Sequence, residues 1–245
     1  MTDHVYDARF MGVTSLSRTS AARIVPLVQA MLQVSSVADF GCALGTWLSV
    51  WQQAGVADVQ GVDGDYLKGQ ALEVNPGFIR HDDLTTPINF GRKFDLVQSL
   101  EVAEHLPPAA AAGFVTTLAR HGDVILFSAA PPGQGGEYHV NEQPYSFWRD
   151  LFSAEGYAMF DPLRGKIAGD ESIRYWYRYN MFLFAKESAV ARLSPEVVAT
   201  RIAAGAVVPD ISPVLFKLRK VAVRNMPRAV SHGIAKVLSK IRTRG

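Results

Sequence analysis

The chain has 245 residues, of which 48% are hydrophobic and 20% charged, which predicts one domain of moderate size with a buried core, plus an appendage. The single cysteine, Cys42, excludes an internal disulfide, no stretch reaches the roughly 18 apolar residues of a bilayer span, and no N-terminal run resembles a signal peptide, so we expect a cytoplasmic protein. The net charge of +2 conceals an asymmetry, since residues 211–245 carry nine Lys and Arg and no acidic residue, against 16 basic and 23 acidic residues before them.

Hydrophobic periodicity predicts strands that alternate with helices. In chain order, the predicted helices are residues 19–33, 45–54, 65–72, 107–120 and 144–155. The predicted strands are residues 37–40, 59–62, 78–81, 94–100, 123–129, 157–160 and 177–186. This alternation favours an α/β fold with a mostly parallel sheet, helices on both faces and an antiparallel final strand. We therefore expect a helical N-terminal extension (1–36), a central domain (37–187) and a basic helical C-terminal extension (188–245).

The first predicted strand and the turn after it carry the most informative residues. Asp39 lies at the end of an apolar run, a turn from Gly41 to Gly45 follows, and the second strand is followed by Asp63. Glycine lets the backbone approach a ligand closely, and a carboxylate at the tip of the second strand can accept hydrogen bonds from both ribose hydroxyls. This unit predicts a nucleoside-binding site.

The turn departs from the G-x-G-x-x-G pattern of dinucleotide sites. A carboxylate at Asp39 would repel a pyrophosphate but suits a ligand with an ammonium and a sulfonium, as S-adenosylmethionine (SAM) has. Residues 39–45 read D-x-G-C-x-x-G and resemble motif I of class I SAM-dependent methyltransferases. The resemblance implies that family's Rossmann-like, seven-stranded sheet. Cys42 has no base nearby in the sequence and is interpreted as a small residue in the ligand turn.

Further polar residues follow the later strands, where ligands bind in open α/β sheets. The resemblance implies that Asp83 and Leu84, after the third strand, recognise adenine, and that Glu101, after the fourth, contacts the methionine moiety. The residues expected to bind SAM are Asp39, Gly41, Cys42, Gly45, Asp63, Gly64, Asp83, Leu84 and Glu101.

Two later segments extend the resemblance. Residues 99–107 resemble the S-L-E-V-x-E-H-L segment of UbiE-like and type 11/23 methyltransferases. Residues 127–143, with Q-G-G and then H-V-N-E-Q, resemble a bacterial subfamily often associated with the modification of sugars or surface glycans. This resemblance implies a sugar-containing acceptor, in a glycan, a glycolipid or a glycosylated metabolite. The motifs are specific for cofactor and fold, and not for the acceptor.

A hydroxyl acceptor requires a group that removes its proton. Histidine suits that role because it titrates near neutral pH, and His139 lies in a glycine-flanked loop expected to close over the pocket. The candidate catalytic residues are His139, Glu142, His105 and Glu104. His121, in contrast, is expected at the surface.

The pattern Glu-x-x-Glu-His with a later His also resembles the magnesium site of RNA 3′-terminal 2′-O-methyltransferases, where the metal binds a vicinal diol. That resemblance implies Glu101, Glu104, His105 and His139 as Mg²⁺ ligands. In the alternative interpretation there is no metal: Glu101 orients the methionine moiety, and Glu104 and His105 only open the next helix.

The end of the chain offers two more predictions. Tyr175 and Trp176, in an expected loop before the last strand, are candidates for stacking on a sugar ring. Apolar residues at helical spacing on both sides of Pro227 predict two basic amphipathic helices in 211–245. These suit peripheral contact with an anionic membrane at its inner face; RNA phosphates, a dimer arm and docking on the body are the alternatives.

Three functions follow from the sequence. We expect a SAM-dependent methyltransferase that O-methylates a sugar hydroxyl. An RNA ribose 2′-O-methyltransferase is the second hypothesis, although the basic tail is the one feature that suits RNA. The third is a catalytically idle SAM-binding protein with a regulatory role. The sequence predicts neither the acceptor's identity nor the oligomeric state.

Overall fold

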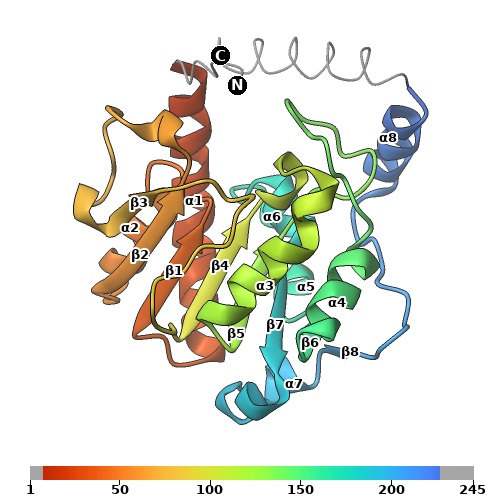
Figure 1. The fold of residues 1–245 in the computed structure, drawn as a ribbon. Coiled ribbons are helices and arrows are strands. Elements are labelled where there is room, and N and C mark those ends of the chain that lie inside the picture. Colours follow the sequence, from red (N-terminus) through yellow and green to blue (C-terminus); the bar gives the residue numbers. More distant parts are fainter. Residues whose placement is uncertain (1–7, 227–245) are drawn as a thin grey trace.

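The computed structural model describes residues 8–226, with side chains from residue 17 onward (Figure 1). Its single sheet has eight strands in the order β3-β2-β1-β4-β5-β7-β6-β8. The strands are β1 (Ser36–Phe40), β2 (Asp58–Asp63), β3 (Ile79–His81), β4 (Leu96–Leu100), β5 (Val124–Ser128), β6 (Tyr157–Phe160), β7 (Phe182–Lys186) and β8 (Arg201–Ile202). Strands β1 to β5 pair in parallel, whereas β7 is antiparallel to β5 and β6, and β8 is antiparallel to β6. The expected mostly parallel sheet is confirmed, with one short strand more than predicted.

Helices cover both faces of this sheet. The α-helices are α1 (Ala8–Met31), α2 (Thr46–Gln53), α3 (Ala111–His121), α4 (Tyr145–Ala154), α5 (Arg164–Ile167), α6 (Tyr175–Asn180), α7 (Pro195–Val198) and α8 (Val214–Arg224). Short 3-10 helices are η1 (Asp65–Leu67), η2 (Pro76–Phe78), η3 (Ala103–His105), η4 (Pro108–Ala110) and η5 (Glu187–Arg192). Within the described residues, no helix has the length and hydrophobicity of a membrane-spanning segment.

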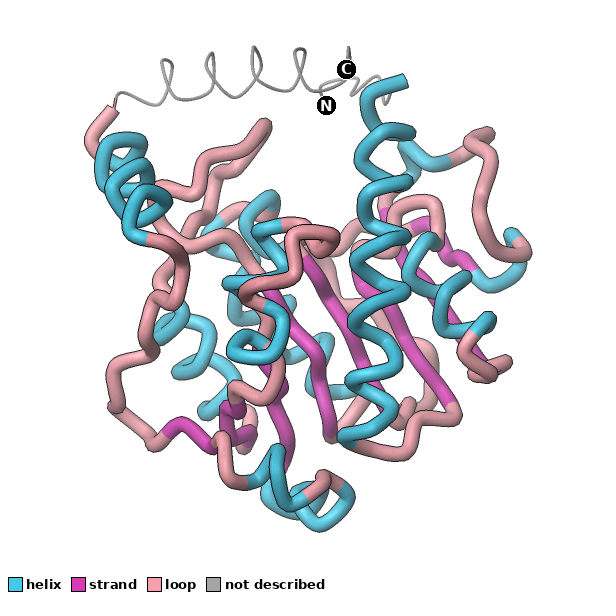
Figure 2. The backbone as a smooth tube through the Cα atoms, turned by 180° about the vertical axis from the view of Figure 1, so that it is seen from behind, coloured by secondary structure: helices cyan, strands magenta, loops and turns pink. Residues whose placement is uncertain are grey.

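Two hydrophobic clusters form the core, one on each face of the sheet. Ile24 of α1 and Trp51 of α2 belong to the first cluster, on the face seen in Figure 2. Phe114 of α3 and Trp148 of α4 belong to the second, on the face seen in Figure 1. Every residue of β4 and β5 is buried, as expected for central parallel strands covered on both sides. Because α1 and α7 also contribute to the first cluster, segments on both sides of residues 37–187 share this core.

One predicted helix, over residues 65–72, is wrong. The chain forms only the 3-10 turn η1 there and then continues as a loop toward β3. Gly69 has a φ angle of +84°, which is incompatible with a right-handed helix at that position. The local composition favoured a helix, but the backbone turns at this glycine instead.

The predicted strand over residues 177–186 is wrong in its first half. Residues 175–180 form the helix α6, and the strand β7 begins only at Phe182. The Tyr177 hydroxyl lies 3.4 Å from Nε1 of Trp47 in α2, with which it is hydrogen-bonded. Aromatic residues favour strands in general, yet here packing against α2 determines the local structure. Tyr175 and Trp176 therefore lie in a helix and not in the expected loop.

The sequence predicted that His121 lies at the surface, and this prediction is wrong: His121 is fully buried. Its Nδ1 lies 2.7 Å from the Thr117 carbonyl, and its Nε2 accepts a hydrogen bond from the Phe90 N–H (2.9 Å). Burial lowers the pKa of this histidine, which favours the neutral ring. His121 is thus a structural residue that joins the end of α3 to the segment before β4.

A buried arginine ties the end of the chain to the sheet. Arg164 is 0% exposed, and its Nη2 lies 2.6 Å from Oδ2 of Asp161. Its Nη1 donates to the carbonyls of Tyr179 (3.1 Å) and Pro209 (3.0 Å), and its guanidinium lies 4.0 Å from the ring centroid of Phe182. One side chain therefore holds α6, β7 and the segment that leads into α8.

We predict that Arg164→Met lowers the free energy of unfolding by roughly 3–5 kcal/mol, since Asp161 and two carbonyls lose a buried partner. Urea denaturation measures this change. The control is Lys166→Met in the same helix, which removes an exposed ion pair with Glu196 and is expected to change stability by less than about 1 kcal/mol. Equal losses in the two variants would contradict the role assigned to Arg164.

Candidate active site

The turn between β1 and α2 has a backbone shape that glycine makes possible. Gly41 and Gly45 have φ angles of +89° and +81°. The Gly41 N–H donates to the Val62 carbonyl at the end of β2 (2.8 Å). A Cβ on Gly41 would lie 2.3 Å from Cγ2 of Val102. Both the φ angle and the packing therefore require glycine at position 41.

Asp63, the last residue of β2, holds this turn. Its Oδ2 accepts a hydrogen bond from the Ala43 N–H (2.7 Å), and its Oδ1 accepts from the Gly64 N–H (2.7 Å) and from the Tyr66 hydroxyl. Burial raises the pKa of Asp63, although these hydrogen bonds oppose the effect. The carboxylate thus lies directly beside the glycine turn, as the sequence predicted. Tyr66, which no sequence motif indicated, is its hydroxyl partner.

Asp39 lies near Asp63, because β1 and β2 are adjacent parallel strands and both residues lie toward their carboxyl ends. It is buried in β1, where it pairs with Gln98 of β4. Burial raises the pKa of Asp39 to about 7, and the charge of Asp63 adds to this while Gln98 opposes it. Burial and the two aspartates also raise the pKa of the Cys42 thiol, which keeps it protonated. Cys42 is therefore a small buried residue of the turn and not an activated nucleophile.

The two aspartates after β3 have local partners. Asp83 is exposed, and its Oδ1 accepts hydrogen bonds from the N–H (2.9 Å) and the hydroxyl (2.7 Å) of Thr85. Asp82 accepts from the Asp83 N–H (2.9 Å) and forms an ion pair with Arg80. Leu84 is buried. The assignment of Asp83 and Leu84 to adenine thus remains a prediction.

Glu101 follows β4 with an unusual backbone. Its φ angle is +58°, which is uncommon for a residue with a side chain and concentrates at functional sites. Its N–H donates to the carbonyl (3.0 Å) and the hydroxyl (3.1 Å) of Ser128 in β5. Its carboxylate accepts from the side-chain amides of Gln134 (3.0 Å) and Asn180 (3.2 Å). Burial raises the pKa of Glu101, and the two amides oppose the increase.

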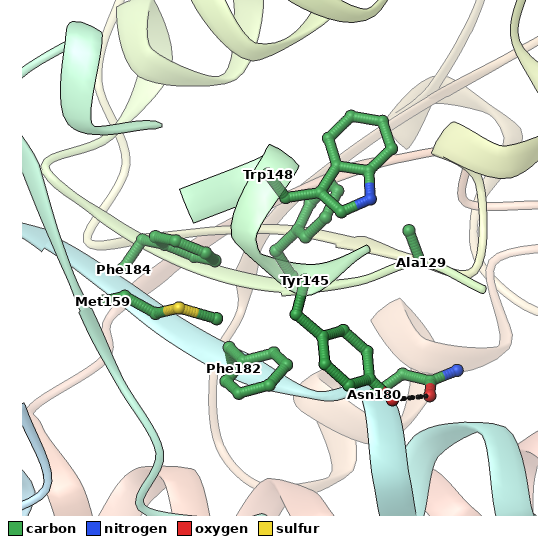
Figure 3. Close-up of a pocket in the computed structure, with 8 residues that line it drawn as sticks. Ala129, Tyr145, Trp148, Met159, Asn180, Phe182 and Phe184 are labelled. Atoms are coloured by element: carbon green, nitrogen blue, oxygen red, sulfur yellow. Dashed lines mark hydrogen bonds between the residues drawn. The ribbon is translucent and has the colours of Figure 1, made fainter. Parts of the chain in front are cut away.

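A second layer of side chains supports Glu101 from α4 and α6. The Tyr145 hydroxyl donates to Oδ1 of Asn180 (2.9 Å), which fixes the amide that binds Glu101 (Figure 3). Asn180 also donates to Oε1 of Gln134 (2.8 Å). The cavity beside Tyr145 in Figure 3 has a volume of about 10 Å³ and is a packing gap in the aromatic core, too small for a ligand. Tyr145 and Asn180 were not predicted as site residues, because only the folded chain brings them to Glu101.

Glu104, in η3, is 0% exposed, and within the described chain neither oxygen of its carboxyl group has a hydrogen-bond partner. Burial raises its pKa well above the usual value, and the nearby charge of Glu101 adds to this. Its backbone carbonyl accepts from the N–H groups of Val140 (2.9 Å) and Asn141 (3.0 Å). The loop that carries His139 is therefore attached to the segment that carries Glu104.

His139 and Glu142 form a hydrogen-bonded pair. Nδ1 of His139 lies 2.8 Å from Oε1 of Glu142. Glu142 also accepts from the N–H groups of Gly133 (2.8 Å) and Gly135 (2.7 Å). Burial alone would raise the pKa of Glu142, but the bond to His139 and these two amides outweigh it and lower the pKa. The ring of His139 also packs edge-on against His105, with ring centroids 4.9 Å apart.

Three of the four predicted metal ligands converge. One potential ligand atom each of Glu104, His105 and His139 lies within 4.8 Å of the others, and the described residues contain no second group of this kind. Glu101 is not in the group, and its carboxylate accepts hydrogen bonds from the side-chain amides of Gln134 and Asn180. Two histidines and an unpartnered buried carboxyl are a donor set that fits a divalent cation.

The helix α8 covers the loop after β5. Nη1 of Arg219 donates to the Gln134 carbonyl (2.9 Å), and Lys220 forms an ion pair with Asp210. A Cβ on Gly133 would lie 2.1 Å from the Lys220 carbonyl oxygen. Two basic residues of the predicted amphipathic helix therefore face the body of the protein and contact the candidate site.

Most of the large apolar residues of α8 have the opposite orientation, whereas Phe216 packs against Tyr175. The most exposed of them, at 59–81%, are Val214, Leu215, Leu218 and Val221, which we call the apolar stripe of α8. The second predicted amphipathic helix, after Pro227, lies outside the described residues. Within the described part, the predicted helix is present, and its apolar side is not packed on the body.

No protein-family model and no curated protein matches the sequence. Solved structures match its fold. The magnesium protoporphyrin IX methyltransferase of Synechocystis PCC 6803, solved with bound SAM, is 19% identical with a TM-score of 0.53, over 71% of this chain and 81% of its own. The sugar N-methyltransferase KedS8 from Streptoalloteichus sp ATCC 53650 is 16% identical with a TM-score of 0.56, over 76% and 94%. The methyltransferase domain of bacterial CtHen1-C is 17% identical with a TM-score of 0.52, over 70% and 98%. This chain therefore has the methyltransferase fold.

The opposite pKa shifts of Glu104 and Glu142 predict opposite effects of pH on stability. The pKa of the Glu104 carboxyl is higher in the folded than in the unfolded state. As pH rises, the unfolded chain therefore releases the Glu104 proton before the folded chain does, so the contribution of Glu104 to stability falls above pH 4.5. Glu104→Gln removes that loss. We expect the free energy of unfolding of this variant to exceed that of wild type by on the order of 1–3 kcal/mol between about pH 5 and pH 8.

Glu142→Gln is the matched comparison. The lowered pKa of Glu142 stabilises the folded state above pH 4.5, so this variant should be less stable than wild type at about pH 8, with a loss that shrinks in acid. Urea unfolding in EDTA measures both variants without a bound cation. A Glu104→Gln difference that does not change with pH would contradict the burial of an unpartnered carboxyl.

Proposed function

We propose that this protein is a SAM-dependent methyltransferase. The observation that carries the proposal is the position of Asp39, the glycine turn and Asp63 together at the carboxyl edge of a sheet with methyltransferase topology. Burial raises the pKa values of both aspartates because it disfavours their charged form. A ligand with an ammonium and a sulfonium group compensates that charge, whereas a pyrophosphate does not.

In this proposal the predicted cofactor residues contact different parts of SAM. Asp39 and Glu101 face the methionine moiety, and Asp63 accepts hydrogen bonds from the ribose hydroxyls. Gly41, Cys42, Gly45 and Gly64 line the ligand with little side-chain bulk. Asp83 and Leu84 recognise the adenine ring. The support for these assignments is that seven of the residues lie around one edge of the sheet, namely Asp39, Gly41, Cys42, Gly45, Asp63, Gly64 and Glu101.

SAM, when bound, supplies an electrophilic methyl group to a nucleophilic atom of the acceptor. A hydroxyl acceptor must lose a proton, and the pair His139–Glu142 suits its removal. Because a carboxylate at Glu142 can only accept, a hydrogen of the His139 ring is assigned to Nδ1, which leaves Nε2 as the candidate base. Glu142 is a positioning residue, since it acts through His139.

We further propose a sugar hydroxyl as the acceptor. KedS8, which shares the fold, is a sugar N-methyltransferase. A base held by a carboxylate favours oxygen as the methylated atom here, because a neutral amine needs little help with its proton. The aromatic residues of α6 beside the site offer apolar faces for a sugar ring.

A divalent cation of the Mg²⁺ type is the second arrangement that the same residues support. Glu104, His105 and His139 would hold it, and the two unpartnered oxygens of Glu104 are the observation in its favour. Such a cation acidifies a bound hydroxyl. Since Nε2 of His139 cannot be both a metal ligand and the base, the two arrangements are distinguishable with EDTA.

The test uses methyl-labelled SAM, purified protein and a cell extract separated into glycan and glycolipid, RNA, protein and small-molecule fractions. We expect label in the glycan and glycolipid fraction, and a loss of about 10²–10⁴-fold in turnover in His139→Gln with unchanged SAM affinity. Val140→Ala, an exposed position in the same loop, is the control and should change turnover by less than about twofold.

Each other outcome decides between the hypotheses. Label in the RNA fraction would favour the ribose 2′-O-methyltransferase. SAM binding without label in any fraction would favour the catalytically idle protein. Activity lost in EDTA and restored by Mg²⁺ would assign Glu104, His105 and His139 as metal ligands, and activity unaffected by EDTA would leave His139 as the base. Failure to bind SAM would overturn the proposal.

We also propose that the apolar stripe of α8 contacts an anionic membrane surface. Four large apolar side chains exposed on one helix face suit insertion at a lipid interface, and residues 211–245 carry nine basic residues and no acidic one. Lys217 and Arg224 are exposed on the same helix. This contact would bring lipid-linked sugars to the site.

We predict that Leu215→Gln with Leu218→Gln weakens co-sedimentation with vesicles of phosphatidylglycerol and phosphatidylcholine by about tenfold, because less apolar area enters the lipid. The control is Val198→Gln, which changes a partly exposed valine of α7 outside the apolar stripe and should bind like wild type. A wild-type protein that does not sediment with these vesicles would refute the membrane contact and leave the methyltransferase proposal unaffected.

A further inference from the structure

A cavity of about 330 Å³ lies between α6 and α8, beside the candidate active site. This volume falls within the range of small-molecule sites, roughly 300–1,000 Å³. Its lining residues come from two segments more than 30 positions apart in the chain and are Tyr175, Arg178, Tyr179, Pro213, Phe216 and Arg219. We call it the α6–α8 pocket.

Two guanidinium groups of this pocket have no carboxylate partner among the described residues. Nη1 of Arg178 donates to the Ala168 carbonyl (3.2 Å), and its Nε is buried without a hydrogen-bond partner. Nη1 of Arg219 donates to the Gln134 carbonyl (2.9 Å). A guanidinium has five N–H donors, so both retain donors for a ligand. Two uncompensated positive charges in one cavity favour an anionic group with several acceptor oxygens.

The other walls of the pocket are aromatic. The ring of Phe216 lies 5.0 Å from that of Tyr175 and 5.9 Å from that of Tyr179, measured between centroids. Rings of this kind pack against apolar faces of a ligand while the tyrosine hydroxyls offer hydrogen bonds. Aromatic walls beside paired arginines thus suit a compact molecule that combines a ring with an anionic substituent.

The pocket is joined to the candidate active site at two points. Tyr179 precedes Asn180, whose amide binds Glu101. Arg219 binds the backbone of Gln134, whose side chain also binds Glu101. A molecule in the α6–α8 pocket would therefore contact Tyr179 and Arg219, which adjoin the two amides that hold the Glu101 carboxylate.

We propose that the α6–α8 pocket binds the acceptor through an anionic group, a phosphate or a carboxylate, carried on a sugar ring, with Arg178 and Arg219 as the residues that recognise the charge. This inference rests on the proposed methyltransferase function for its biological meaning. The recognition itself is a binding property that can be measured without turnover.

The experiment measures the affinity of the full chain for glucose 6-phosphate, glucuronate and glucose by ligand-observed NMR, with SAM affinity measured on the same samples. We expect the phosphate or the carboxylate to bind about tenfold or more tightly than glucose, as two charge-assisted contacts predict. The two charged probes distinguish a phosphorylated acceptor from a uronic acid. Equal affinity for all three probes would overturn the proposal.

The variant Arg178→Gln with Arg219→Gln should abolish that preference. Because Arg219 also holds the Gln134 loop, Arg178→Gln alone is the second variant, and it should weaken binding of the charged probe in the same direction. The control is Arg92→Gln with Arg120→Gln, which removes the same charge before the amino ends of β4 and β5, at the opposite edge of the sheet. It should bind all probes like wild type.

The outcomes separate this inference from the proposed function. A protein that binds the charged sugar in an Arg178-dependent way but does not bind SAM would refute the methyltransferase and retain the pocket. A protein that binds SAM but shows no charge preference, or whose preference survives both arginine variants, would refute the pocket and retain the methyltransferase.

Discussion

The burial of four carboxyl groups at one edge of the sheet is the constraint on which the rest of this structure depends. Burial raises the pKa values of Asp39, Asp63, Glu101 and Glu104, which lie at or just after the ends of β1, β2 and β4. Buried charges are unfavourable unless hydrogen bonds or cations compensate them. Backbone and side-chain N–H groups compensate Asp63 and Glu101, whereas Glu104 has no partner within the described chain. The edge is therefore suited to ligands that bring positive charge.

Long-range contacts complete this site. The loop after β5 is held from inside by Glu142, which accepts from two glycine N–H groups, and from outside by α8 through Arg219. Glu104 anchors the same loop through its backbone carbonyl. The candidate base His139, the amide of Gln134 and the wall of the α6–α8 pocket therefore belong to one connected unit. The helix α8 therefore contacts the loop that carries the candidate site residues.

The sequence predicted the parts of the fold that local patterns determine. Apolar runs located strands such as β5, and the turn at Gly41 and the carboxylate at Asp63 followed from their order along the chain. It failed where tertiary contacts decide, as in α6, whose aromatic residues suggested a strand. The sequence also did not indicate how closely the loop after β5 is packed: a Cβ on Gly133 would lie 2.1 Å from the Lys220 carbonyl oxygen, and a Cβ on Gly136 would lie 2.1 Å from Nε2 of His139. Asn180 and Tyr145 could not be predicted, because no local pattern connects them to Glu101.

The most direct test of the central claim is the affinity of SAM measured by calorimetry between about pH 5.5 and pH 8, for wild type and Asp39→Asn. Asp39 has a pKa of about 7 in the free protein, and only its ionised form attracts the ammonium of SAM. Wild-type affinity is expected to rise with pH through this range, and Asp39→Asn should bind more weakly with most of that rise removed. The same pH dependence in both proteins, or no SAM binding at any pH, would contradict it.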